Sequence, residues 1–227
     1  MFNKVKWVGV KVKGLNPRGL VKNGVVFYRA PAVSIINMIP NGSFETNATG
    51  WTLTGSNPAF ARAALPVANP LVTYSPNAQC LRCNGSANAQ FYIVITPALS
   101  ITSGRIYYIT ACVRTANTNC NGVSLFNNTT ALFGSNGAGN SPPSGAAPIS
   151  GTSWNRVSFR WTANSASLTL RFEFNRANGN NAKDVAIDNI MVIDLTGTFG
   201  SGQEPSLQQM NDIVSGMGGY WDTAALY

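Results

Sequence analysis

Acidic side chains are scarce in this sequence and histidine is absent. The 227 residues include 8 Asp and Glu and 0 His, so the commonest general base and the usual imidazole ligand for metals are both missing. A glycoside hydrolase would need two opposed carboxylates instead. The carboxylates available to the strand-rich part of the chain are Glu45, Glu173, Asp184, Asp188 and Asp194. Histidine-dependent catalytic triads are therefore excluded.

Four cysteines form a second group of potential ligands. Cys80 and Cys83 have the Cys-x-x-Cys spacing, but residues three apart on a strand point to opposite faces, and the sequence has no second pair of this kind. This pattern disfavours zinc. Cys112 and Cys120 flank a predicted turn, which leaves a disulfide between them as an alternative. We expect four small buried thiols.

Positive charge is concentrated near the N-terminus. The formal net charge is +8, and charged residues make up 11% of the chain, against about 25% in ordinary domains. The basic residues before position 30 are Lys4, Lys6, Lys11, Lys13, Arg18, Lys22 and Arg29. They alternate with apolar residues and do not form a run, which disfavours nucleic acid and favours a protein partner or a solvated strand face.

Neither a membrane span nor a secretory signal is predicted. No stretch approaches the roughly 20 apolar residues that cross a bilayer. The N-terminal residues also lack an apolar signal region. We therefore expect a protein that is made in the cytoplasm and does not insert into a membrane.

The hydrophobic pattern predicts an all-β protein in three parts. Residues 1–36 are predicted to form a basic β-hairpin arm that turns at Asn23-Gly24. Residues 37–196 hold the strands of one domain, in which the Gly-, Ser- and Pro-rich segment 134–151 is predicted to be an exposed loop. Residues 197–227 are predicted to contain a short helix, opened by a capping box from Ser206 to Gln209, and an aromatic tail.

The sequence Asn41-Gly-Ser-Phe-Glu45, followed by Gly50-Trp51, resembles the opening of the jelly-roll carbohydrate-binding modules of cellulases and xylanases. Segments 105–114, 154–161, 167–174 and 185–192 resemble later strands of that family, in the same order. The resemblance implies a jelly-roll β-sandwich over residues 37–195. It also implies that the first core strand begins near Phe44 and that Trp51 and Trp154 pack in the core.

The same resemblance implies a structural calcium ion. In this type of jelly roll the first and last core strands are neighbours, which would bring Glu45 and Asp188 together, and the family commonly holds Ca²⁺ there. Calcium binds carboxylates and carbonyl oxygens, so the main-chain oxygens of Gly42 and Ser43 are the expected additional ligands. The alternative is that Asp188 caps a turn while Glu45 pairs with Lys183 or an arginine.

Modules of this family recognise sugars through aromatic faces that stack on pyranose rings and through amide side chains. The resemblance therefore makes carbohydrate-binding candidates of Trp161, Tyr92, Tyr74 and Asn88. Further candidates are Tyr107, Phe133, Asn84 and Gln90. The carboxylates of the matched region fall at structural positions of the family, so we expect no hydrolytic activity.

The C-terminal segment 194–222 is similar to the end of many bacteriophage tail and minor structural proteins. In those proteins a jelly-roll strand is followed by Thr-Phe-Gly-x-Gly-x-Glu-Pro, which here spans 198–205, and by a short helix. The two resemblances together predict a non-enzymatic virion structural protein of a tail, a fibre or a capsid decoration, assembled in the host cytoplasm. Its arm would bind other virion proteins and its jelly roll would face host-surface glycans, in a homo-oligomer that we expect to be a trimer. The alternative is a carbohydrate-binding module of a secreted polysaccharide-degrading system.

Overall fold

The computed structural model describes residues 19–22, 25–28, 33–55, 61–73, 77–83, 91–95, 98–115, 120–133, 147–149, 152–176 and 185–227. The chain divides into two compact units, Met1–Val33 and Ser34–Tyr227. In the first unit, β1 (Gly19–Lys22) and β2 (Val25–Tyr28) pair antiparallel with Lys22 opposite Val25. The hairpin predicted around residues 23 and 24 is confirmed.

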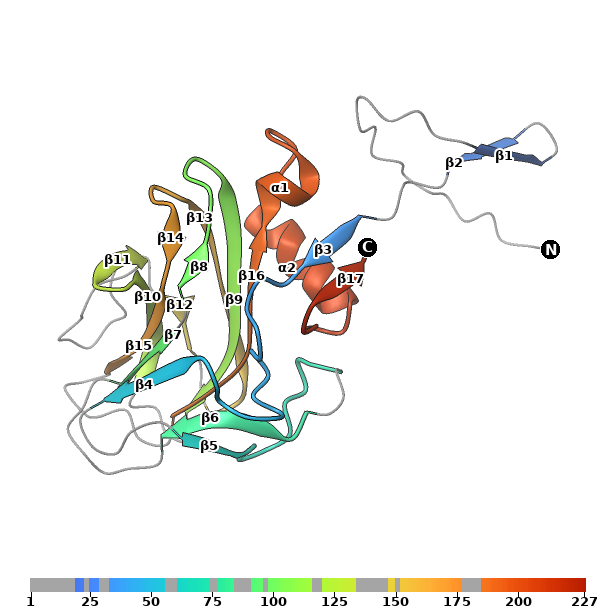
Figure 1. Cartoon of the computed structure of the whole chain (residues 1–227). Coiled ribbons are helices and arrows are strands. Elements are labelled where there is room, and N and C mark those ends of the chain that lie inside the picture. Colours follow the sequence, from blue (N-terminus) through green and yellow to red (C-terminus); the bar gives the residue numbers. More distant parts are fainter. Residues whose placement is uncertain are drawn as a thin grey trace. The chain divides into compact units, whose positions relative to one another are not determined.

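The described part of the second unit contains two large antiparallel sheets and two small two-stranded ones (Figure 1). The five-stranded sheet has the order β13 (Asn155–Thr162), β9 (Ile106–Thr115), β16 (Val185–Asp194), β6 (Gln79–Cys83), β5 (Ala61–Ala64). The other sheet has the order β11 (Thr130–Phe133), β10 (Cys120–Asn127), β15 (Leu170–Arg176), β7 (Phe91–Ile95), β4 (Trp51–Gly55), and β12 (Ala147–Pro148) also pairs with β10. The predicted all-β jelly-roll sandwich with a short C-terminal helix is confirmed.

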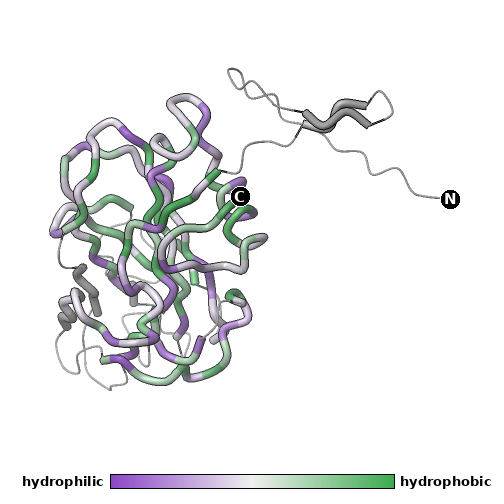
Figure 2. The backbone as a smooth tube through the Cα atoms, turned by 45° about the vertical axis from the view of Figure 1, so that its right-hand side comes forward, coloured by the Kyte–Doolittle hydropathy of each residue, from purple (hydrophilic) through white to green (hydrophobic). Residues whose placement is uncertain are grey.

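The hydrophobic core lies between the two sheets. Along β9, Tyr107, Ile109, Ala111 and Val113 belong to this core, so alternate residues of the strand face inward. The facing sheet contributes every second residue of β15, beginning with Leu170. Fully burying a side chain of this size contributes about 1.5–3 kcal/mol. Figure 2 shows hydrophobic and hydrophilic stretches following each other along the tube of this unit.

The outward face of the five-stranded sheet is covered by the C-terminal residues. After β16 the chain forms α1 (Leu195–Phe199) and α2 (Leu207–Gly216), and the hydroxyl of Tyr108 on β9 donates to Asn211 Oδ1 at 2.8 Å. The predicted capping box is confirmed, because Ser206 and Gln209 each bond the other's main-chain N–H. The predicted C-terminal segment thus belongs to the same compact unit as the sandwich.

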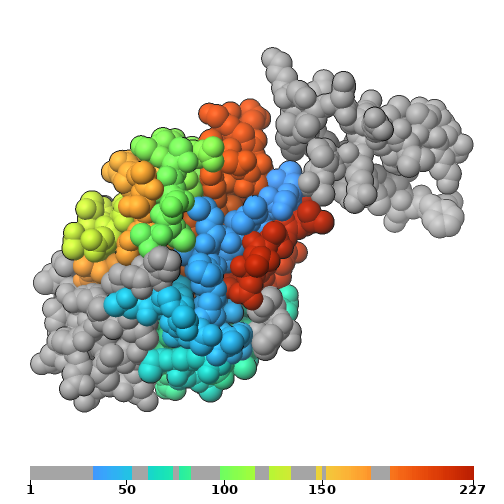
Figure 3. All heavy atoms as spheres, in the orientation of Figure 1, coloured from blue at the N-terminus to red at the C-terminus, as the bar shows by residue number. Residues whose placement is uncertain are grey.

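The C-terminal strand β17 (Ala224–Leu226) pairs with β3 (Ser34–Ile36). The smallest remaining pair joins β8 (Leu99–Ser100) to β14 (Ser167–Leu168). Figure 3 shows the blue segment that follows β3 lying against the red C-terminal residues. Tyr220 and Trp221 are buried in this layer. No helix in the described part of the chain is long and apolar enough to span a bilayer.

The start of the sandwich differs from the prediction in one respect. Residues 40–43 form a turn, Phe44 has a φ of 57°, and the first core strand begins at Trp51. A strand starting near Phe44 is therefore wrong, since an L-residue at positive φ cannot continue an extended strand. Phe44 is nevertheless fully buried and makes an edge contact with Trp51, with ring centroids 4.8 Å apart.

The cysteines follow the thiol prediction where the structure describes them. Cys80 and Cys112 are both buried, and Cys112 is a free thiol. The alternative disulfide between Cys112 and Cys120 is therefore wrong, because Cys112 lies inside β9, between its strand partners Arg156 and Asp188. The side chains of Cys83 and Cys120 lie outside the described part. The predicted loop at 134–151 lies outside it as well, except for 147–149.

Candidate functional site

Glu45 anchors the segment that leads into β6. Its Oε1 atom accepts hydrogen bonds from the backbone N–H groups of Ala78 at 2.7 Å and Gln79 at 3.1 Å. The guanidinium of Arg62 on β5 holds the other side of this turn. Its Nε donates to the Phe44 carbonyl at 2.6 Å, and an Nη atom donates to the Glu45 carbonyl. An arginine is therefore present, as the alternative prediction proposed, but it binds the main chain of Glu45.

Asp188 is a fully buried carboxylate at an irregularity in β16. The register of β16 against β9 shifts between Asp188 and Met191, and Asn189 has a φ of 51°. Asp188 Oδ1 accepts from the Asn189 N–H at 2.8 Å, whereas Oδ2 is buried and has no hydrogen-bond partner among the described residues. Such an unpaired buried oxygen is costly. This geometry calls for a further group beside Oδ2.

The electrostatics of Asp188 connect it to Glu45. Burial raises the pKa of Asp188 to about 8, the Asn189 N–H opposes the rise, and the negative charge of Glu45 adds to it. The last strand also runs beside the turn that precedes Glu45, because Ile190 N donates to the Gly42 carbonyl at 3.0 Å and Met38 N to the Val192 carbonyl at 2.8 Å. The predicted pairing of the first and last core strands is wrong, because β4 and β16 belong to different sheets. The segment from Met38 to Gly42, and not a strand that contains Glu45, runs beside β16.

Amide side chains complete this polar cluster, which we call the Asp188 cradle: Glu45, Asn69, Asn77, Asp188 and Asn189. Asn69 Nδ2 donates to Asn189 Oδ1 at 3.2 Å, and Asn77 Nδ2 donates to the Asn69 carbonyl at 3.3 Å. Asn77 Oδ1 and Asn189 Nδ2 are buried without partners. Sequence reasoning missed the asparagines, because their loop is distant from both carboxylates in the sequence.

The cradle offers donors of the kind that calcium takes. Within the described residues, Asp188 Oδ2 and Asn77 Oδ1 are oxygens without a hydrogen-bond partner, and the charges of Asp188 and Glu45 favour a cation beside Asp188. Asp188 and Glu45 would hold the ion, which would neutralise their repulsion. No three His, Cys, Asp or Glu residues gather around a point in the described part of the chain, so amide and main-chain oxygens would have to complete the coordination.

The two predicted main-chain ligands have other roles that are visible in the structure. Ser43 is buried, and the Gly42 carbonyl already accepts from Ile190 N. A Cβ atom at position 42 would lie 2.2 Å from the Ile190 carbonyl oxygen. Glycine is therefore required there by the close approach of two backbone segments. Whether either carbonyl also binds a cation stays a prediction.

Most of the predicted sugar-stacking residues are not placed on a described surface. Trp161 is 8% exposed and Tyr107 is 1% exposed, and both belong to the core between the sheets. The platform role of Trp161 is wrong, because its position on β13 faces inward and leaves no open ring face. Tyr107 is also fixed by its hydroxyl, which accepts from Thr102 N at 2.9 Å.

The two tryptophans predicted to lie in the core are confirmed there, and the remaining sugar-binding candidates stay predictions. Trp51 and Trp154 are buried as predicted, and Trp154 Nε1 donates to the Val67 carbonyl at 3.0 Å. Tyr92 pairs with Glu173 in the register of β7 and β15, but its side chain is outside the described part. The remaining candidates, Tyr74, Asn88, Asn84 and Gln90, also lie outside the described residues.

Phe133 borders a hollow at one edge of the sandwich. The hollow has a volume of about 380 Å³ and lies beside the edge strand β13. We call it the Phe133 hollow. The residues that line it are Phe133, Ala147, Pro148, Arg156, Val157, Ser158, Phe159, Arg160 and Leu207. The half-buried ring of Phe133 packs on buried Phe159 at a centroid distance of 4.9 Å and an interplanar angle of 34°.

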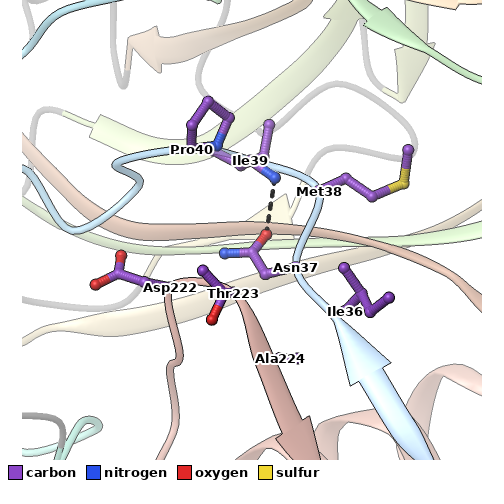
Figure 4. A pocket seen from close by; sticks show the side chains of 8 residues that line it. All are labelled: Ile36, Asn37, Met38, Ile39, Pro40, Asp222, Thr223 and Ala224. Carbon is purple, nitrogen blue, oxygen red and sulfur yellow. Dashed lines mark hydrogen bonds between the residues drawn. The ribbon is translucent and has the colours of Figure 1, made fainter.

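A second hollow, of about 330 Å³, lies where β3 meets the C-terminal strand (Figure 4). Asn37 lies among the residues that line it, and all its side-chain hydrogen bonds serve the fold. Its Oδ1 accepts from Ile39 N and Val192 N, both at 3.1 Å, and its Nδ2 donates to the Trp221 carbonyl at 3.0 Å. This hollow marks the junction that ties the start of the sandwich to its end.

Comparison with protein-family models and with curated proteins finds no match. Solved structures with a similar fold include the enzymatically active domain of tailspike protein 4 of bacteriophage CBA120, which is 16% identical with a TM-score of 0.47 and covers 69% of this chain. This chain spans 21% of that tailspike chain. TmCBM61, solved with β-1,4-galactotriose, is 15% identical over 70% of this chain and 98% of its own, with a TM-score of 0.46. The xylan-binding CBM22-1 of Paenibacillus barcinonensis Xyn10C is 16% identical over 73% and 97%, with a TM-score of 0.42.

Proposed function

We propose that this chain is a non-enzymatic structural protein of a bacteriophage particle, and that its sandwich binds host-surface glycans at the Phe133 hollow. The observation that carries the binding proposal is the hollow itself. Its volume of about 380 Å³ falls within the range of ligand pockets, and it combines a partly exposed aromatic ring with polar side chains. Sugars are bound by this combination of stacking and hydrogen bonding.

The absence of catalysis is proposed because the described carboxylates have structural partners. Glu173 is fully buried and pairs with Arg171 at 3.3 Å, and Asp194 pairs with Arg105 at 2.6 Å while capping α1. Asp222 accepts from the Tyr220 hydroxyl, and Asp212 accepts from Gln208. A hydrolase would need two carboxylates facing substrate. Asp184, the remaining acid of the matched region, lies outside the described part.

The phage assignment rests on the C-terminal motif, whose residues form one self-contained turn. Gly200 and Gly202 adopt φ values of 92° and 77°, which favour glycine. The carboxylate of Glu204 accepts from Thr196 Oγ1 at 2.7 Å and from Gly202 N at 2.8 Å. The Gly and Glu positions of the motif thus each have a role in this turn, and the phage assignment rests on the sequence similarity alone.

We further propose that the basic arm anchors the protein to other virion proteins, that the assembly is a homotrimer, and that the Asp188 cradle holds a structural calcium ion. The seven positive charges before residue 30 support the arm assignment. The unpartnered oxygen of Asp188 supports the cation. Sedimentation of the full chain, and particle incorporation after deletion of residues 1–30, test the first two of these assignments.

A glycan array tests the binding proposal with the full chain and two variants. Phe133→Ala should abolish binding to the glycans that the native protein retains. Tyr227→Ala removes an aromatic ring that is 59% exposed elsewhere and should change nothing. Release of reducing ends is measured on the same glycans. Hydrolysis of a bound glycan, or binding that survives loss of Phe133, would contradict the proposal.

A further inference from the structure

The Phe133 hollow has a marked charge as well as an aromatic wall. Two arginines, Arg156 and Arg160, are among its lining residues, and none of those residues is acidic. Both lie on β13, on the same side of the strand, with Ser158 between them as the alternate residue. The ligand that fills this hollow must therefore be compatible with two guanidinium groups.

Each arginine is fixed by a main-chain carbonyl, but only Arg160 is exposed, so only its remaining donors are accessible to a ligand. Arg160 Nε donates to the Pro205 carbonyl at 3.2 Å, and Arg156 Nη2 donates to the Leu71 carbonyl at 3.0 Å. Arg156 Nη1 is buried without a partner in the described part of the chain. A guanidinium has five N–H donors in a planar fork that matches a carboxylate. The bonds to Pro205 and Leu71 position these side chains without neutralising them.

Nearby groups change the field of these arginines in opposite directions, because the N-terminus of α2 adds to it and the charge of Glu204 offsets part of it. Leu207, the first residue of α2, also lines the hollow, so the positive end of that helix borders it. Glu204 is the acid whose charge interacts with Arg160. The Glu204 carboxylate already accepts from Thr196 Oγ1 and Gly202 N, which commits it to the turn.

We propose that the ligand of the Phe133 hollow is an acidic saccharide, one that carries carboxylate groups as uronate residues do. The pyranose face would contact Phe133 and the carboxylate would accept from the exposed Arg160, in the charge-assisted pairing that arginine favours, while the positive charge of Arg156 would add to the attraction. This inference rests on the proposed function, because it names the class of glycan that the proposed site selects. It adds a charge requirement that the fold alone does not imply.

Calorimetric titration of the full chain with oligogalacturonate hexamer, and with neutral cellohexaose and maltohexaose, tests the inference. The acidic hexamer should bind at least about tenfold more tightly than either neutral sugar. Its affinity should fall as salt is raised. Arg160→Gln should weaken acidic binding about tenfold, and Arg160→Lys should restore part of the loss because it keeps the charge.

Arg62→Gln is the matched control, since Arg62 also bonds main-chain carbonyls but lies on β5, at the opposite edge of the sheet. It should leave the affinity unchanged. An equal loss in Arg62→Gln and Arg160→Gln would show that binding follows net charge and would overturn the inference. Equal binding of acidic and neutral hexamers, abolished by Phe133→Ala, would overturn the inference while the proposed function stands. Binding of no glycan on the array and of none of the hexamers would overturn the proposed glycan binding as well.

Discussion

The Asp188 cradle and the Phe133 hollow both contain polar side chains, but they use them differently. In the cradle, Glu45 and the asparagines bind the main chain or each other, and the carboxylate of Asp188 is fully buried. In the hollow, Arg160 is exposed and is held by a carbonyl at one nitrogen. In the first arrangement the polar side chains bond within the fold, and in the second we propose that the exposed donors bind a ligand. The comparison shows that a polar residue type is informative about function only once its partners are known.

The largest effect should come from the core residue that positions the cradle. Phe44→Ala removes a fully buried ring that contacts Trp51, and should lower the free energy of unfolding by about 3–5 kcal/mol. Chemical denaturation measures it. Val67→Ala, at a position that is 47% exposed, is the control and should cost less than about 0.5 kcal/mol. Similar losses in both variants would contradict the assigned core.

The second prediction concerns pH and calcium. The folded pKa of Asp188, about 8, lies above its ordinary value of 3.8, so the folded state binds more protons between these values. In EDTA the Asp188 contribution is therefore present below about pH 4 and is lost as pH rises towards 8, by on the order of a few kcal/mol. The measurement is the difference in free energy of unfolding between native protein and Asp188→Asn across that range.

Calcium should reverse this loss, because a cation beside Asp188 Oδ2 favours the ionised carboxylate. We expect calcium to stabilise the native protein more at pH 8 than at pH 5, and to leave Asp188→Asn unchanged. Equal calcium stabilisation of both proteins would place the ion elsewhere. Neither calcium nor the Asp188→Asn substitution should change the affinity for glycans. This expectation separates the role of the cradle from that of the hollow.

A smaller effect is expected where two backbone segments approach closely. Gly42→Ala would bring a Cβ atom 2.2 Å from the Ile190 carbonyl oxygen, and should cost about 1–3 kcal/mol through the displaced backbone. Gly216→Ala is the matched control, since a Cβ there meets no atom within 4 Å. Thermal or denaturant unfolding compares the two variants. A neutral Gly42→Ala would contradict the close contact beside the cradle.

The smallest predicted effect lies at the border of the hollow. Ser206→Ala removes the N-cap hydrogen bond to Gln209 N, and should destabilise the protein by about 1 kcal/mol. Ser215→Ala, in the exposed last turn of α2, should be close to neutral. Circular dichroism during denaturation reports both. If Ser206→Ala is as stable as the native protein, α2 is held by packing alone.

The fold was predicted more fully than the site. The strands β9 and β13 were predicted from their resemblance to a known family, whereas the turn at 23–24 and the capping box at Ser206 follow from local physics, and the structure confirms all four. The conformation of Phe44 could not be predicted, because its positive φ depends on the tertiary position of the turn. Trp161 was assigned to the surface because the sequence pattern alone does not say which face of an edge strand points inward.

Much of the site depends on residues that are distant in the sequence. Asn69 meets Asn189, and Asn77 meets Asn69, only after the loop folds over the sheet. The arginines of β13 were not predicted as site residues, because an alternating Arg-x-Ser-x-Arg pattern is equally typical of a solvated strand face. Phe133 was among the predicted aromatic candidates, and its place beside these arginines became clear only from the structure.

The most direct test of the whole account is an amide chemical-shift titration of the full chain, first with calcium and then with oligogalacturonate. The account predicts two separate sets of perturbed residues. Calcium should shift the amides around Glu45, Asn77 and Asp188, and the saccharide should shift those around Phe133, Ala147 and Arg160. Saccharide-induced shifts centred on the cradle, or the same residues responding to both ligands, would contradict the assignment of fold stabilisation to one region and recognition to the other.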